Sequence, residues 1–130
     1  MKSRYVIIAS ALFLSVASIA QKNEIKAAEK ALKAGKSDEA ITILTAAEYL
    51  TTNAPDAEKA QFLYVKGNAY LDLANKNVEA DKNLSLAAKA YQELLAAENA
   101  SGKSKYSAQA ATSIVEIKNK LINAAIEDTK

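Results

Sequence analysis

The chain has 130 residues, half of them hydrophobic, and it contains no cysteine and no histidine. These two absences exclude disulfide bonds, the usual zinc sites, and the Ser-His-Asp and Cys-His catalytic arrangements. Lysine and arginine number 17 against 15 aspartates and glutamates, so no strong positive field favours nucleic acid as a partner.

Residues 1–20 have the three-part layout of a secretory signal peptide. Two cationic residues precede an apolar run over residues 5–16, and Ser18-Ile19-Ala20 places small residues at the positions that signal peptidase reads. A retained membrane anchor is the alternative, but the apolar run is shorter than the ~20 residues needed to span a bilayer. We therefore expect an exported protein whose mature domain comprises residues 21–130.

Five amphipathic helices are predicted in the mature domain, because apolar residues recur at spacings of three and four and no period-2 alternation indicates a strand. The first covers about residues 23–34 and ends at Gly35. The second begins at Ser37, a good N-cap residue, and continues to about residue 50. Pro55 then interrupts the pattern, since proline is tolerated only in the first turn of a helix.

The third helix extends to about Ala74, and the polar stretch Asn75–Asn83 is predicted to be a turn region because asparagine favours turns. The fourth helix covers about residues 84–98 and the fifth begins near Ser104. No glycine cap or proline ends the fifth helix, so we expect the protein to continue beyond Lys130.

Gly67 lies in the interior of the third helix, where glycine costs roughly 1 kcal/mol relative to alanine. Short connections pair successive helices into antiparallel hairpins, and a glycine at a crossing allows two helices to pack very closely. Tyr70 lies beside Gly67 on the same face. On the fourth helix, Ala87 is the matching small residue and Tyr91 follows one turn later.

This pattern resembles the tetratricopeptide repeat, a helical hairpin of roughly 34 residues with small and large residues at set positions. Gly67 and Tyr70 match the family's first helix, and Ala87, Tyr91 and Leu94 match its second helix. About eight extra residues around the polar stretch depart from the family pattern.

An earlier hairpin is similar in its second helix, where Ala40 and Leu44 stand at the family's small and large positions. The chain as a whole resembles the N-terminal part of exported tetratricopeptide-repeat proteins of Gram-negative bacteria, which implies a periplasmic location. The resemblance implies an all-α fold of antiparallel hairpins, over about residues 21–52 and 56–98, stacked as a short α-solenoid with a long final helix over about 104–129. An alanine-rich helical bundle without repeat ancestry is the alternative.

The resemblance also implies a concave surface that is lined by the first helix of each hairpin and binds a partner polypeptide. In the second hairpin the candidate partner-binding residues are Gln61, Tyr64, Asn68, Leu71 and Asp72, and the first hairpin would add Lys22, Ile25, Glu29 and Lys33. Tyr64 beside Asn68 suits recognition, since an amide can hydrogen-bond to a peptide backbone. Alternatively, Tyr64 packs between hairpins and Asn68 faces water.

The predicted function is therefore a non-enzymatic protein–protein interaction scaffold, with no cofactor, metal, nucleic acid or small-molecule substrate expected. A structural alternative is a self-associating helical bundle of the cell envelope, a homodimer whose fifth helix pairs through Tyr106, Ile114, Ile117 and Leu121. An enzyme would need chemistry from tyrosine, lysine and carboxylates alone. Adjacent acidic pairs such as Asp38-Glu39 point about 100° apart on a helix and do not converge on a substrate.

Overall fold

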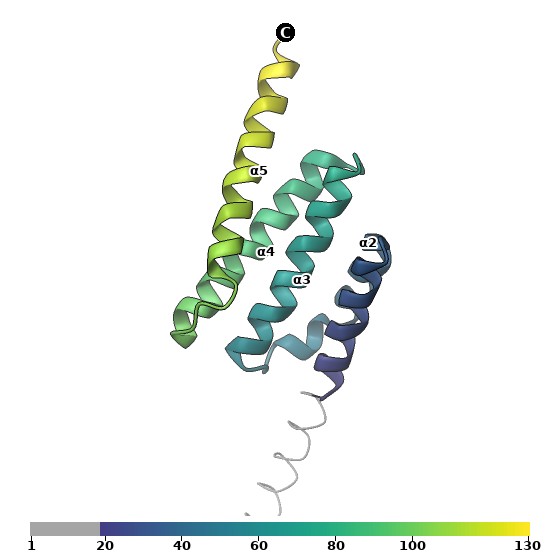
Figure 1. Ribbon diagram of the computed structural model, residues 1–130, viewed down its shortest axis with the longest axis vertical. Helices are drawn as coiled ribbons and strands as arrows, with labels where there is room; N and C mark the ends of the chain where they lie inside the picture. The colour runs from purple at the N-terminus through teal and green to yellow at the C-terminus, as the bar shows by residue number, and fades with distance from the viewer. Residues whose placement is uncertain (1–18) are drawn as a thin grey trace, which may run out of the picture.

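The structure, a computed structural model, describes residues 19–130, and every element of regular structure in that range is helical (Figure 1). Residues 19–33 form an N-terminal helix, which is followed by α2 (Ser37–Ala47), the short 3-10 helix η1 (Glu48–Thr51), α3 (Asp56–Asn75), α4 (Ala80–Ser101) and α5 (Ser107–Asp128). The prediction of an all-α fold with five helices is confirmed, whereas their stacking as a solenoid stays a prediction. Residues 1–18 of the predicted signal peptide lie outside the described residues.

Helices that follow one another in the chain pack against one another. The most extensive contact joins α3 to α4, α4 also packs against α5, and α2 packs against α3. In Figure 1 the helices lie side by side, and α5 extends beyond its neighbours toward the C-terminus. Its last buried residue is Ile117, so the final turns of α5 project from the body of the molecule.

The core consists of two hydrophobic clusters, and α3 contributes to both. Phe62, Val65 and Ala69 pack with the N-terminal helix and α2, whereas Ala60 and Ala74 pack with α4 and α5. A helix that is apolar on two sides has to be covered on two sides. The amino-acid pattern of α3 therefore makes it the central helix.

The turn before α2 differs in one respect from the prediction. Gly35 ends the N-terminal helix as expected, with a φ of +79° and the Lys36 amide donating to the Ala31 carbonyl at 2.9 Å. The prediction of Ser37 as N-cap is wrong: Lys36 holds that position, and Ser37 is the first helical residue and is buried. Its hydroxyl donates to Asp72 on α3 instead of capping its own helix.

The predicted turn region at Asn75–Asn83 is also much shorter than expected, because α3 continues to Asn75 and α4 begins at Ala80. Asn77 takes the left-handed conformation that ends a helix, and the Val78 amide donates to the Leu73 carbonyl at 3.0 Å. Asn83 lies buried in α4, where its side-chain nitrogen donates to the Val78 carbonyl at 2.7 Å. The extra residues lengthen two helices rather than a loop.

Glu98 holds the turn between α4 and α5, a role that helical periodicity does not predict. Its carboxylate, in a residue only 3% exposed, accepts hydrogen bonds at 2.8 Å from the backbone amides of Lys105 and Tyr106 and from the Ser107 hydroxyl. Burial alone would raise the pKa of Glu98, but the Ser107 and backbone hydrogen bonds together lower it below its ordinary value. A buried carboxylate thus caps α5 from the preceding helix.

Gly67 is buried on α3 and faces the ring of Tyr91 on α4. A Cβ atom at this position would lie 2.6 Å from Cε1 of Tyr91, and the three atoms nearest to it all belong to that ring. Among the other predicted packing residues, Ala40, Leu44, Ala87 and Tyr91 are buried and Tyr70 is half-buried. The glycine thus makes room for an aromatic ring, a different reason from the direct approach of two helices that the sequence suggests.

We expect Gly67→Ala to lower the free energy of unfolding by about 1 kcal/mol. Overpacking against the fully buried Tyr91 ring costs roughly 1–3 kcal/mol, which outweighs a helix-propensity gain of roughly 1 kcal/mol. Chemical denaturation measures the change. In a Tyr91→Leu background, where the ring is gone, the same substitution should become stabilising. A Gly67→Ala variant that is more stable than the natural protein would contradict this account.

We expect Glu98→Gln to lower the free energy of unfolding by about 1–3 kcal/mol at neutral pH, because buried amides lose a charged acceptor. The folded pKa of Glu98 is below the unfolded value, so its contribution is complete above about pH 4.3 and is lost as the pH falls through the folded pKa. Urea denaturation from neutral to acidic pH should show the gap between natural and variant protein closing. Glu93→Gln, at an exposed position on α4, is the matched control and should change stability little. A difference in unfolding free energy between the natural protein and Glu98→Gln that stays constant with pH would refute the role of the charge.

Candidate functional site

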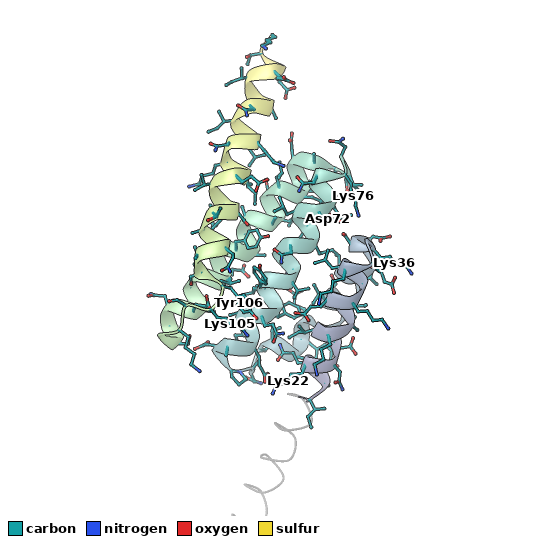
Figure 2. All side chains as sticks on the ribbon, in the orientation of Figure 1. Lys22, Lys36, Asp72, Lys76, Lys105 and Tyr106 are labelled. Carbon is teal, nitrogen blue, oxygen red and sulfur yellow. The ribbon has the colours of Figure 1, made fainter. Side chains whose placement is uncertain are left out.

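The five predicted partner-binding residues all lie on α3, and all five are half-buried. Each of them also contacts another helix or turn, so part of each side chain is already engaged within the protein. Figure 2 places Asp72 and Lys76 at one end of this region, and Tyr106 with Lys105 near the other.

Tyr64 stacks on Tyr106, the residue that precedes α5. Their ring centroids lie 4.5 Å apart at an interplanar angle of 20°, and the Lys105 ammonium lies 5.2 Å from the centre of the Tyr106 ring. Tyr64 therefore packs between the second hairpin and α5, as the alternative reading of this residue had it. One ring face is covered, while the residue stays partly accessible.

Asn68 is engaged with Tyr91 rather than facing water. The Tyr91 hydroxyl, which belongs to a residue with no exposed surface, donates to the Asn68 side-chain carbonyl at 2.6 Å. Burial raises the pKa of Tyr91 to about 12, and a hydrogen bond from Ser113 on α5 opposes that rise. The expectation of an amide wholly available to a peptide backbone needs correction, because its carbonyl already has a donor.

Asp72 joins α3 to the turn before α2. Its carboxylate accepts hydrogen bonds from the Ser37 hydroxyl and from Lys76 Nζ, the latter at 2.8 Å. The same Lys76 nitrogen donates to the Gly35 carbonyl at 2.9 Å. The hydrogen bond from Lys76 and then that from Ser37 lower the pKa of Asp72. This residue ties two segments together, while 38% of its side-chain surface stays exposed.

Gln61 connects α3 to the N-terminal helix. Its side-chain nitrogen lies 3.5 Å from Glu29 Oε1. Lys22, two turns before Glu29, forms an ion pair of 3.4 Å with Glu58, one turn before Gln61. Leu71, the last of the five, packs half-buried against the α3–α4–α5 cluster, whereas Ile25 is fully buried in the other cluster. Ile25 therefore cannot contribute to a binding surface.

These contacts define one continuous face, which we call the α3 face: it consists of Lys22, Glu29, Gln61, Tyr64, Asn68 and Tyr106. Gln61 meets Glu29 on one side and Tyr64 meets Tyr106 on the other. The face thus runs from the N-terminal helix across α3 to the start of α5. It combines charges of both signs with two amides and two aromatic rings.

Two cavities form where η1, α3 and α4 meet. The larger cavity has a volume of about 250 Å³ and the smaller one about 120 Å³. Glu48 and Glu93 line both cavities; Phe62 also lines the larger one and Tyr70 the smaller one. Lys66 bridges to Glu48 at 2.9 Å beside them. Both are smaller than typical ligand pockets of 300–1,000 Å³. Nothing in the helical periodicity signals them, because they depend on where η1 turns the chain.

The outer side of α5 is apolar and exposed. Val115, Ile122 and Ile126 are 58%, 57% and 52% exposed. The residues predicted for dimer formation lie on the other side: Ile114 and Ile117 are buried in the cluster with α4. That prediction is wrong in its residues, because α5 folds back on α4 and covers this stripe itself.

Between residues 19 and 130 no helix is long and apolar enough to cross a membrane. In the same range no group of three or more carboxylates is placed to hold a metal ion. No family model, curated protein or solved structure matches the chain. The tetratricopeptide resemblance accordingly rests on the residues themselves and stays a prediction.

We expect Tyr91→Phe to lower the free energy of unfolding by about 1 kcal/mol, because the half-buried Asn68 carbonyl loses its donor. The pKa of Tyr91 is about 12 in the folded protein against 10.0 ordinarily. The contribution of this phenol to stability is therefore complete below pH 10 and is lost as the pH rises through 12. Tyrosinate absorbance during an alkaline titration should show one late-titrating phenol that is missing from the variant. Tyr49→Phe, at a residue 74% exposed, is the control; a late phenol that persists in Tyr91→Phe would contradict the assignment.

Proposed function

We propose that this protein is an exported helical-repeat scaffold of the tetratricopeptide type, which binds a partner polypeptide on the α3 face in the periplasm. The observation that carries the proposal is the continuity of this face. Contacts from Gln61 to Glu29 and from Tyr64 to Tyr106 join the N-terminal helix, α3 and the residue at the start of α5, the fifth helix. In stacked hairpins these are the helices that line the concave side.

The chemistry of the face indicates an extended polypeptide as the partner. Half-buried Tyr64 offers an aromatic edge to an apolar side chain, and the amide of Gln61 can pair with a peptide backbone. Lys22 and Glu29 add one charge of each sign, so no strongly charged partner is favoured. Because these side chains already contact neighbouring helices, little side-chain entropy remains to be lost on binding, which favours affinity.

The proposal is tested by site-specific photo-crosslinking in the full chain, expressed with its own leader in a Gram-negative host. A photoreactive aromatic residue in place of Tyr64 should crosslink to one periplasmic polypeptide, identified by mass spectrometry. For the purified pair, Tyr64→Ala should weaken binding at least tenfold, the loss of about 1.4 kcal/mol expected of an aromatic contact residue. Thermal melting of the variant checks that it is folded.

Tyr49→Ala serves as the matched control, because Tyr49 is an exposed tyrosine on η1, away from the α3 face. It should leave the affinity unchanged. Equal losses from both tyrosines, or a crosslink from position 49 and none from position 64, would count against the proposed face.

Self-association is the second candidate, favoured by the exposed apolar side of α5. Val115, Ile122 and Ile126 recur at spacings of seven and four, as in helices that pair with one another. Size-exclusion chromatography with light scattering separates the two hypotheses, since the scaffold is expected to be a monomer. A dimer that Ile122→Lys dissolves, and that the exposed polar replacement Asn123→Lys leaves intact, would favour the structural role.

A further inference from the structure

The side chain of Gln21, in the first described turns of the N-terminal helix, is fully buried, with 0% of its surface exposed. Within residues 19–130 neither its amide nitrogen nor its amide oxygen has a hydrogen-bond partner. Burying an amide without partners is unfavourable, and such groups are rare in folded proteins. Only this residue combines complete burial with an amide lacking partners in the described part of the chain.

Gln21 is also the residue that follows the predicted signal-peptidase site at Ala20. Cleavage there would place an α-ammonium group on Gln21, at the start of a helix. A positive charge at this end opposes the helix dipole, and a buried position makes an unpaired charge costly. An unmodified N-terminus would add this charge to an amide that already lacks partners.

We propose that residue 21 is a modification site, at which the N-terminal glutamine cyclises to pyroglutamate after the leader is removed. Signal peptidase first hydrolyses the Ala20–Gln21 bond with one water molecule. The freed α-amino nitrogen then attacks the side-chain Cδ and the Cδ–Nε2 bond breaks. The amide nitrogen leaves as ammonia with the proton that the amino group gives up. This inference rests on the export part of the proposed function, but not on peptide binding.

The reaction needs no oxidant, reductant or other co-reactant. An α-amino group has a pKa near 7.7–8.0, so roughly a tenth of it is neutral and nucleophilic at pH 7. The attacking nitrogen and the carbonyl carbon belong to one residue and close a five-membered ring, which makes the attack intramolecular. The resulting lactam is uncharged and keeps a single N–H donor and a single carbonyl.

A neutral, compact end group fits the surroundings of residue 21. The helix start is held against the body of the molecule: Lys22 pairs with Glu58 at 3.4 Å, and Ile25 one turn later is fully buried in the core. Figure 2 shows Lys22 at the foot of the described molecule, where this helix begins. Cyclisation removes the ammonium charge and the side-chain NH₂ group from a packed position, so it should stabilise the folded mature protein.

The test uses the full chain with its own leader, exported in a Gram-negative host, purified and incubated at neutral pH without any added cyclase, since the attack is intramolecular. Intact-mass and peptide mass spectrometry should show a chain that starts at residue 21 and is lighter than the open form by one ammonia. N-terminal sequencing should be blocked, and pyroglutamyl aminopeptidase should restore it with Lys22 as the first residue. Gln21→Glu, cleaved at the same bond, is the control expected to remain open.

A second measurement compares the melting temperature of the cyclised chain with that of the Gln21→Glu chain. The cyclised form should melt at the higher temperature. A glutamine that stays open throughout the incubation, a cleavage site elsewhere, or equal melting of the two forms would overturn the proposal. Retention of the leader would contradict export as well, whereas a cyclised chain that gives no crosslink at position 64 would count against the partner-binding proposal alone.

Discussion

One side chain, Tyr91, connects the three helices on which the candidate site depends. This fully buried side chain belongs to α4, and its ring lies over Gly67 on α3. Its hydroxyl donates a hydrogen bond to Asn68, which also lies on α3. The same ring packs in the cluster that contains Ala110, Ile114 and Ile117 of α5. A phenol this deep in a core is tolerated only when its hydroxyl has partners. The hydrogen bond to Asn68 and the glycine under the ring set the position of α3 against α4, and the packing of the ring brings α5 against the same cluster.

The α3 face follows from that arrangement. Its residues hold neighbouring helices while they stay partly accessible, as Gln61 does toward Glu29 and Tyr64 toward Tyr106. Glu98 contributes from a distance, because its buried carboxylate fixes the backbone at Tyr106 and so the ring on which Tyr64 stacks. Because these side chains depend on contacts with neighbouring helices, substitutions in the core can alter the face.

Local chemistry predicted the helices well and their connections less well. Gly35 and Pro55 delimit helices as expected, since glycine and proline restrict the backbone whatever surrounds them. The polar stretch Asn75–Asn83 was misjudged because asparagine can end one helix, as Asn77 does, or lie buried in the next, as Asn83 does. Ser37 was misjudged for a similar reason: its hydroxyl could cap α2, but a carboxylate on α3 lies within reach.

The sequence by itself determined that the described chain is helical and where most helices lie. These properties depend on the spacing of apolar residues and on backbone restrictions, both of which act within a few residues. Only the tertiary structure decided the partner of each polar group. It placed Ile114 and Ile117 against α4 rather than against a second molecule, and it assigned Glu98 to the start of α5. Those choices depend on which side chains meet across helices, and helical periodicity carries no information about distances between residues far apart in the chain.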